Sequence, residues 1–135
     1  MLELADQNAL EWAKTKAESF EDTALRLQKK LQLAVLPERI ECVDISNLQG
    51  SDAVGSIVTF EDGRPLKSHY RKFKIRQTEG PNDYAMMFEV LQRRFRRSLK
   101  PVDEEEQRKW ASPDLLLVDG GKGQLGAACE ELASL

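Results

Sequence analysis

The first part of the chain lacks both residues that most often interrupt a helix, because all eight glycines and all five prolines lie after residue 36. Residues 2–34 are instead rich in Ala, Leu, Glu, Lys and Gln, which favour helix. Apolar side chains recur there at alternating steps of three and four, which is typical of a narrow helical seam. The seam consists of Leu10, Ala13, Ala17, Phe20, Ala24, Leu27 and Leu31. The sequence therefore predicts one long amphipathic helix ended by Pro37.

This helix is expected to dock on its own domain or on a neighbouring one, and a coiled-coil partner helix is the alternative. We assign residues 1–36 to the helical segment and residues 37–135 to the domain that follows.

After the helix, the pattern changes to strands. Three runs are expected to form them, at residues 40–45, 53–60 and 66–75. The middle run is β-branched, and Asp62-Gly63 after it is a hairpin turn signal. The third run alternates as an edge strand does, with a slip of phase between Tyr70 and Phe73 that suggests a bulge. These features predict a three-stranded antiparallel meander.

The second half of the chain predicts two helices and one strand. We expect a helix over about 83–99, a polar connection over 100–113 whose acidic run 103–106 is a solvated loop, a strand at 115–118, and a helix from about 124. Asn82, after Gly80-Pro81, is a suitable N-cap for the first helix. The strand is uniformly apolar, as in a strand buried on both faces.

The order of these elements predicts an α/β fold with a mixed sheet. The crossover after the meander brings a fourth strand beside the first, with helices on the faces of the sheet. The sheet is expected to be incomplete, because the last helix ends in the apolar residues Leu132 and Leu135. We therefore expect a fragment of a longer chain.

Composition excludes several classes of protein. With 20 Lys and Arg against 23 Asp and Glu, the net charge of −3 excludes a wholly basic nucleic-acid binder but not a local basic patch. No apolar run approaches the roughly 18 residues of a membrane span, and residues 1–6 do not resemble a signal peptide. Cys42 and Cys129 are too far apart for a zinc finger and suit a cytoplasmic protein.

Three aspartates are candidate site residues. Asp44 interrupts an apolar strand, Asp119 ends the last strand, and Asp83 opens a helix. Individually they also fit ordinary roles: a buried carboxylate with a loop or arginine partner, a turn residue, and a helix cap. If they converge, three carboxylates without His or thiolate partners form a hard-oxygen site for Mg²⁺ or Mn²⁺. Two such ions about 4 Å apart can drive phosphodiester hydrolysis.

Other residues suggest phosphate contacts. The segment Gly120-Gly121-Lys122-Gly123 precedes a helix and can place backbone amides and Lys122 near a phosphate, but it fits neither a P-loop nor a dinucleotide fingerprint. A nucleotide-binding enzyme is therefore a remote alternative. Basic residues cluster at Arg71, Lys72 and Lys74 and at Arg93, Arg94, Arg96 and Arg97. They form either a solvated face or a strip that follows DNA phosphates. We expect His69 to face solvent, without a catalytic role.

Four ordered motifs carry a resemblance to a known family. They are RIECVDISN at 39–47, YRKFKI at 70–75, GPNDYAMM at 80–87 and PDLLLVDGGKGQ at 113–124. The chain resembles the carboxyl-terminal endonuclease domain of the UvrC family, the nuclease subunit of bacterial nucleotide excision repair, whose fold is similar to RNase H. The resemblance implies Mg²⁺- or Mn²⁺-dependent incision of the damaged strand on the 5′ side of a lesion.

The resemblance also implies partners and residue roles. The partners are damaged double-stranded DNA and UvrB, downstream of the UvrA–UvrB system, with no membrane and no small-molecule substrate. The catalytic and metal-binding aspartates of the family fall on Asp44, Asp83 and Asp119, and Lys122 falls on a lysine expected to contact phosphate. We expect further DNA contacts from Arg71, Lys72, Arg93, Arg94 and Arg97.

The resemblance has two departures. The family has a further catalytic histidine downstream of the GGKGQ motif, which His69 does not match. The amino-terminal nuclease domain that makes the 3′ cut, the UvrB-binding segment and the helix-hairpin-helix module of the family are also not represented. A non-catalytic RNase H-like scaffold or interaction module is the alternative function.

Overall fold

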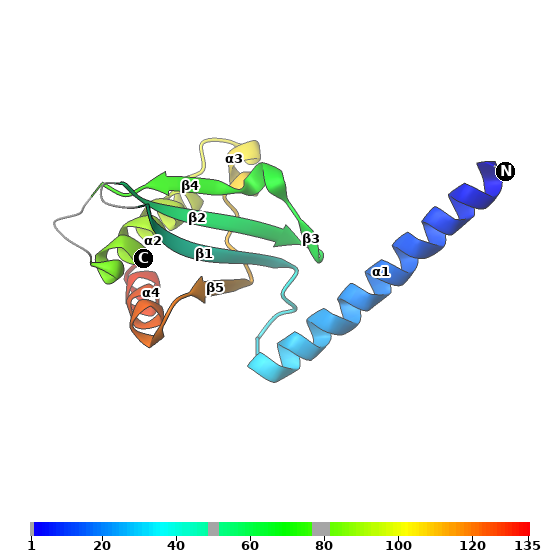
Figure 1. The fold of residues 1–135 in the computed structure, drawn as a ribbon, viewed down its shortest axis with the longest axis horizontal. Coiled ribbons are helices and arrows are strands. Elements are labelled where there is room, and N and C mark those ends of the chain that lie inside the picture. Colours follow the sequence, from blue (N-terminus) through cyan, green and yellow to red (C-terminus); the bar gives the residue numbers. More distant parts are fainter. Residues whose placement is uncertain (1, 49–51, 77–81) are drawn as a thin grey trace.

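The computed structural model describes residues 2–48, 52–76 and 82–135. One long helix, α1 (Leu2–Leu31), extends beside a domain built on a sheet (Figure 1). The helix ends at Leu31, before the predicted stop at Pro37, because Gln32 takes a left-handed conformation with φ 54°. Its seam is only partly used: Ala24 is buried, whereas Leu10 is 70% exposed, and the side chain of Ala17 lies outside the described residues.

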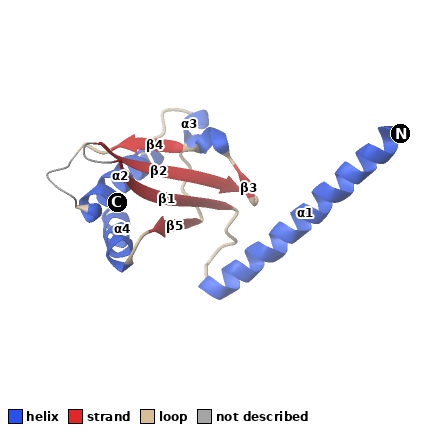
Figure 2. Ribbon diagram, in the orientation of Figure 1, coloured by secondary structure: helices blue, strands red, loops and turns tan. Residues whose placement is uncertain are grey.

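The sheet is mixed, as predicted. Its strands are β1 (Arg39–Leu48), β2 (Asp52–Glu61), β3 (Arg64–Pro65), β4 (Arg71–Lys74) and β5 (Leu115–Asp119). They follow the order β3-β2-β1-β5, and β4 also pairs with β2 (Figure 2). β1 and β2 are antiparallel, and β5 runs parallel to β1. The last strand therefore lies beside the first, where the crossover was expected to bring it.

The turn between β2 and β3 is the predicted hairpin. Asp62 and Gly63 both have positive φ, at 49° and 74°, which is typical of the type I′ turn that an Asp-Gly pair favours. A side chain on Gly63 would overlap the ring of Phe20, so α1 contacts the domain at this turn.

The third predicted strand is interrupted, which corrects the expectation of one edge strand over 66–75 with a bulge. After the short β3, the chain forms a 3₁₀ turn, η1 (Lys67–His69), before β4 begins. The amide of His69 donates to the carbonyl of Leu66 at 2.9 Å, and the Thr59 hydroxyl donates to the carbonyl of His69 at 3.2 Å. These bonds satisfy the backbone locally, so the strand ladder is broken before residue 70.

Helix α2 (Asp83–Leu99) begins at the predicted cap, where Asn82 accepts a hydrogen bond from the Ala85 amide at 3.2 Å. The preceding Gly80-Pro81 lies outside the described residues. The acidic run predicted as a loop instead begins a short helix, α3 (Glu104–Lys109), because Asp103 accepts from the Glu106 amide at 2.7 Å. The final helix is α4 (Lys122–Ser134).

Helices α2 and α4 cover one face of the sheet (Figure 2). Side chains alternate along β1, so Arg39, Glu41 and Val43 are buried on this face, whereas Asp44 lies on the other, which we call the open face. Within the described residues, no helix packs across the open face. This corrects the expectation that the last strand is buried on both faces: Leu117 of β5 is 45% exposed. Among the described residues, no helix combines the length and apolar character needed to cross a membrane.

Candidate functional site

Asp44 and Asp119 lie side by side on adjacent strands. They are direct partners in the parallel pairing of β1 with β5, so both side chains project from the open face. Neighbouring strands are about 4.8 Å apart, which places the two carboxylates within reach of one ligand. Asp44 is half-buried and accepts a hydrogen bond from the Ser46 hydroxyl at 2.8 Å, while Asp119 is exposed at the end of its strand.

The charges of both carboxylates affect the pKa of the Cys42 thiol. Burial raises the pKa of Cys42, and the negative charges of Asp119 and Asp44 raise it further. Cys42 precedes Asp44 by two residues and therefore shares the open face. Two negative charges and a half-buried thiol thus occupy one small region, where a cation would be favoured.

Asp83 is not part of this pair and lies at the start of α2, beside the loop that follows Asp119. It is exposed at the first turn of α2 and lines a cavity of about 260 Å³. The cavity is also lined by Asn82, Tyr84, Gly121, Gly123 and Gln124, so Asp83 faces the segment that follows Asp119. Among the described residues, no group of three His, Cys, Asp or Glu side chains is placed to hold one metal ion. The structure thus brings together two of the three predicted aspartates and sets the third beside the neighbouring loop.

The glycines of this loop allow α2 and α4 to meet. A side chain on Gly123 would overlap the hydroxyl of Tyr84, so glycine is what lets the first turn of α4 approach α2. The Gln124 side chain accepts from the Gly121 amide at 2.7 Å and caps α4. Lys122, the predicted phosphate contact, is exposed in the same turn.

The predicted DNA-contacting residues divide into exposed and buried ones. Lys72 and Arg97 are exposed. Arg93 and Arg71 are partly buried: Arg93 donates to Glu89 and to the carbonyl of Lys74, and Arg71 donates to two backbone carbonyls. Arg94 requires a correction, because its side chain is 2% exposed and is unavailable to a DNA phosphate.

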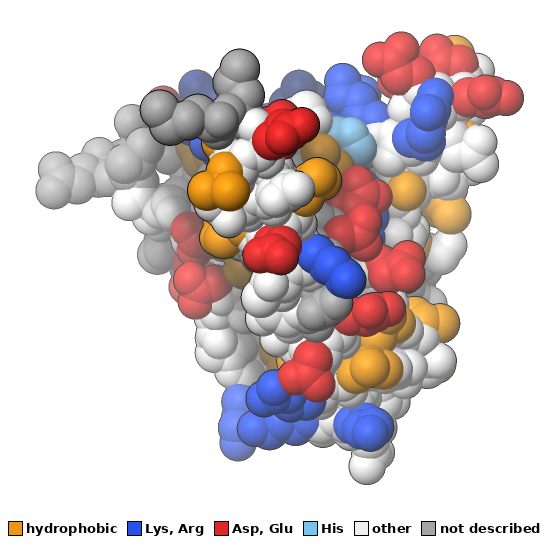
Figure 3. Space-filling view, turned by 90° about the vertical axis from the view of Figure 1, so that its right-hand side faces the viewer, with side chains coloured by type: hydrophobic (Ala, Val, Ile, Leu, Met, Phe, Trp, Pro, Cys, Tyr) orange, Lys and Arg blue, Asp and Glu red, His pale blue; other side chains and the backbone are white. Residues whose placement is uncertain are grey.

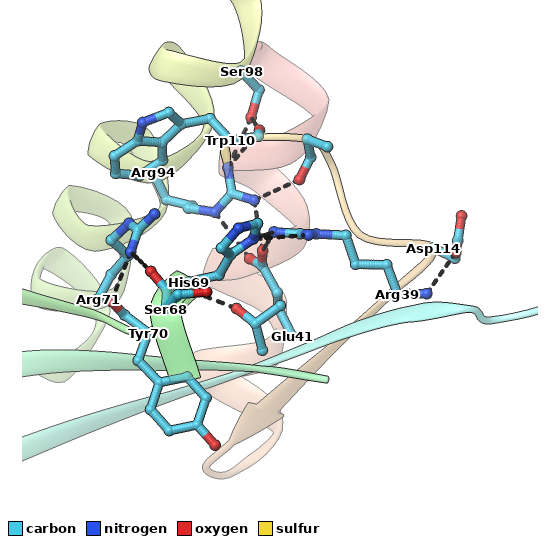
Figure 4. Close-up of polar contacts among 12 residues, drawn as sticks. Arg39, Glu41, Ser68, His69, Tyr70, Arg71, Arg94, Ser98, Trp110 and Asp114 are labelled. Carbon is cyan, nitrogen blue, oxygen red and sulfur yellow. Dashed lines mark hydrogen bonds and ion pairs between the residues drawn. The ribbon is translucent and has the colours of Figure 1, made fainter. Parts of the chain in front are cut away.

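The sequence reasoning missed the partner of Arg94. Glu41, which is 1% exposed, accepts from Arg94 Nε at 2.9 Å and from Arg94 Nη2 at 2.6 Å (Figure 4). The buried carboxylate of β1 is therefore Glu41 and not Asp44. The alternation of side chains along β1 could have indicated this, because Glu41 shares a face with the core residue Val43, whereas Asp44 does not.

His69 is also tied into this region, which corrects the prediction that it faces solvent. It is half-buried, and its Nδ1 lies 3.2 Å from both terminal nitrogens of Arg39, so the neutral ring accepts from the guanidinium (Figure 4). Burial lowers the pKa of His69, and the charges of Arg39, Arg71 and Lys109 lower it further against the opposing effect of Glu61.

Comparison with known proteins identifies the family. Residues 28–135 match the family model described as the UvrC RNase H endonuclease domain. The chain belongs to the UvrC family. The mixed sheet and its helices agree with the RNase H-like fold of that domain.

Relatives named UvrABC system protein C are similar to the whole chain. The protein from Clostridium novyi is 43% identical over 150 residues, which cover 100% of this chain and 24% of that protein. The protein from Syntrophus aciditrophicus is 46% identical over 100% of this chain and 21% of its own length. The protein from Gemmatimonas aurantiaca is 49% identical over 100% of this chain and 22% of its own length. The chain thus spans between a fifth and a quarter of the length of these UvrC relatives.

Proposed function

We propose that this chain carries the centre at which a UvrC protein cuts the damaged strand on the 5′ side of a lesion in bacterial nucleotide excision repair. The observation that carries the proposal is the pairing of Asp44 with Asp119 on the open face. Its support comes from the match to the UvrC endonuclease domain and from the position of Asp83 beside the loop after Asp119.

The residues of this pair fit a divalent cation. Two carboxylates on adjacent strands repel each other unless a cation lies between them, and oxygen ligands suit Mg²⁺ or Mn²⁺. We propose that Asp44 and Asp119 hold the ion and that Asp83 contributes a third carboxylate from the rim of its cavity. A divalent ion bound there supplies Lewis-acid stabilisation of the negative charge that develops at the reacting phosphate.

The surrounding groups hold and orient the site. The Ser46 hydroxyl fixes one carboxylate oxygen of Asp44, which leaves the other free for a ligand. Lys122 and the amino-terminal turns of α2 and α4 present positive charge beside Asp83, as the binding of a phosphate group requires. Exposed Lys72 and Arg97 extend the contacts with the DNA backbone, which position the duplex without reading its sequence.

We propose damaged duplex DNA and UvrB as the partners of this chain. The relatives carry the name of a UvrABC system, which supports assembly with other proteins of that system. Helix α1 is the candidate contact, because Leu4, Leu10 and Leu25 are exposed on it. The same observation favours a second candidate function, a non-catalytic module that joins UvrC to its partners through α1.

Substitution of the paired aspartates in the full-length protein tests the proposal. Asp44→Asn and Asp119→Asn each remove one negative charge at nearly constant volume, and we expect each to abolish 5′ incision of a damaged duplex while 3′ incision continues. Asp52→Asn is the matched control, since Asp52 is an exposed carboxylate on β2 whose partner is Lys74 at 3.2 Å. Undiminished 5′ cutting by Asp44→Asn or Asp119→Asn would contradict the proposal and leave the interaction module as the remaining function.

A further inference from the structure

A second cavity lies at the beginning of β1, away from the paired aspartates. It has a volume of about 560 Å³ and lies between the end of the sheet, η1 and α3. Charged and polar side chains that line it are Arg39, Glu61, Ser68, His69, Glu105, Arg108 and Lys109. Arg39 precedes Asp44 by five residues on the same strand, which corresponds to about 17 Å. The cavity is therefore separate from the proposed nuclease site.

The wall of this cavity contains a buried cation whose charge is only weakly balanced. Glu41 is held at two points by Arg94, at 2.6 and 2.9 Å, whereas Arg39 reaches the same carboxylate through one contact of 3.3 Å. Arg39 is 6% exposed, and its Nε has no hydrogen-bond partner among the described residues. One carboxylate thus serves two buried guanidinium groups, which leaves an excess of positive charge at the cavity wall.

Further cations surround Trp110 behind this wall. The guanidinium carbons of Arg71, Arg97 and Arg94 lie 4.6, 5.0 and 5.6 Å from the centre of the Trp110 ring. Arg71 Nη2 is buried and has no hydrogen-bond partner among the described residues. The aromatic face offers these groups a weak attraction but no negative charge. A chain with a net charge of −3 therefore has a positive region here.

The balance of charges along the cavity itself is also positive. Arg39, Arg108 and Lys109 face two carboxylates, Glu61 and Glu105, and the His69 ring accepts from Arg39 as a neutral group. Figure 3 shows acidic and basic side chains gathered around the single histidine, which is drawn in pale blue. Burial is the main cause of the lowered pKa of His69, and the charges of Arg39, Arg71 and Lys109 lower it further against the opposing charge of Glu61, which agrees with a net positive potential at the ring.

We propose that this cavity is an anion-binding site that takes a phosphate group. Arg108 and Lys109 are exposed lining residues that supply positive charge, Arg39 supplies it from the buried wall, and Ser68 offers a hydroxyl donor. Guanidinium groups match the geometry of phosphate oxygens, and an anion compensates the buried charge that Glu41 shares between two arginines. Free phosphate and a phosphate of the DNA backbone present the same chemistry to these residues.

The single histidine makes the site directly observable. The imidazole protons of His69 give a unique NMR signal from the cavity wall. Inorganic phosphate is added to the whole chain at constant ionic strength, with chloride as the reference anion. We expect a saturable shift of the His69 signal and a higher His69 pKa in phosphate than in chloride, because a bound anion stabilises the imidazolium.

Exposed residues provide variants that leave the buried network intact. Arg108→Ala combined with Lys109→Ala is expected to weaken phosphate binding by about tenfold or more, because charge-assisted contacts are lost. Glu61→Gln combined with Glu105→Gln is expected to strengthen binding, because it removes opposing charge. Lys14→Ala, an exposed lysine on α1, is the matched control and should leave binding unchanged.

A short duplex without divalent ions distinguishes the two sources of phosphate. If the cavity takes a backbone phosphate, the duplex moves the same His69 signal and competes with inorganic phosphate. If the cavity takes free phosphate, inorganic phosphate moves the His69 signal and the duplex does not. This result also supports the anion-binding site. A His69 signal that responds to phosphate no more than to chloride, and does not respond to the duplex, would overturn the inference. Incision by the full-length protein does not enter this test, so its outcome is independent of the proposed nuclease site.

Discussion

Arg94 on α2 holds Glu41 on β1 through two hydrogen bonds, with Nε at 2.9 Å and Nη2 at 2.6 Å from the carboxylate oxygens. The same guanidinium donates to the carbonyl of Trp110 at 3.1 Å and to that of Ala111 at 2.8 Å. One side chain thus joins β1, α2 and the segment leading to β5. β1 and α2 carry Asp44 and Asp83, and the segment leads into β5, which carries Asp119, so the ion pair helps fix their relative positions.

Loss of Arg94 is expected to destabilise the fold strongly. Arg94→Met leaves Glu41 buried with only the long contact to Arg39, and breaking a buried pair in this way costs about 3–5 kcal/mol. Urea unfolding followed by circular dichroism measures the loss. In the double variant Arg94→Met with Glu41→Gln, the loss of unfolding free energy is expected to be smaller than the sum of the losses in the two single variants. Additive costs, or a loss below about 1 kcal/mol for Arg94→Met, would show that the pair contributes little.

The stability of the chain is expected to fall on acidification, in part through His69. Its pKa is lowered in the folded state, so the unfolded chain takes up the proton first, and the contribution of His69 to stability is lost as pH falls below about 6.5. Burial is the largest cause of this lowered pKa; the charges of Arg39, Arg71 and Lys109 lower it further, and that of Glu61 opposes them.

The matched variant is His69→Asn, whose side-chain oxygen can still accept from Arg39 but does not titrate. The melting temperature is measured by thermal unfolding at pH values from about 7.5 to about 5.5. Lowering the pH should reduce the melting temperature more in the unsubstituted chain than in this variant. Equal slopes for the two proteins would contradict the role assigned to His69.

Because β2 packs closely on α2, adding a single methyl group at Gly55 is expected to lower the stability of the chain. A side chain on Gly55 would overlap the buried side chain of Val90, so Gly55→Ala is expected to destabilise the chain by about 1–3 kcal/mol in urea unfolding. The cost should shrink when Gly55→Ala is made in a Val90→Ala background, where space is available.

Gly126→Ala is the control for this substitution. Gly126 lies within α4 with open space where a side chain would begin, so alanine there should stabilise the helix by about 0.5–1 kcal/mol. Similar losses of stability for both substitutions would indicate a general intolerance to replacement and not overlap with Val90.

Local signals in the sequence predicted much of the fold. The cap at Asn82 placed the start of α2, the Asp62-Gly63 pair placed the hairpin, and the crossover placed β5 beside β1. Each of these features is determined by residues close together in sequence or by chain connectivity. The pairing of Asp44 with Asp119 follows from the same connectivity.

What escaped prediction depends on contacts between distant residues. Arg94 belongs to a run of arginines that is typical of a solvated helix, and its burial is decided by Glu41, 53 residues earlier in the chain. The 3₁₀ turn before β4 depends on Thr59 of β2, which binds the carbonyl of His69. The charge of the acidic run alone predicts a solvated loop, whereas the cap at Asp103 starts helix α3 there.

The measurement that tests the central claim most directly is calorimetric titration of Mn²⁺ into the chain and its variants. We expect binding that is millimolar or tighter, because Asp44 and Asp119 present adjacent carboxylates on the open face. Asp44→Asn and Asp119→Asn should each abolish it, and Asp52→Asn should leave it unchanged. Equal Mn²⁺ binding by Asp44→Asn and the unsubstituted chain would contradict the account.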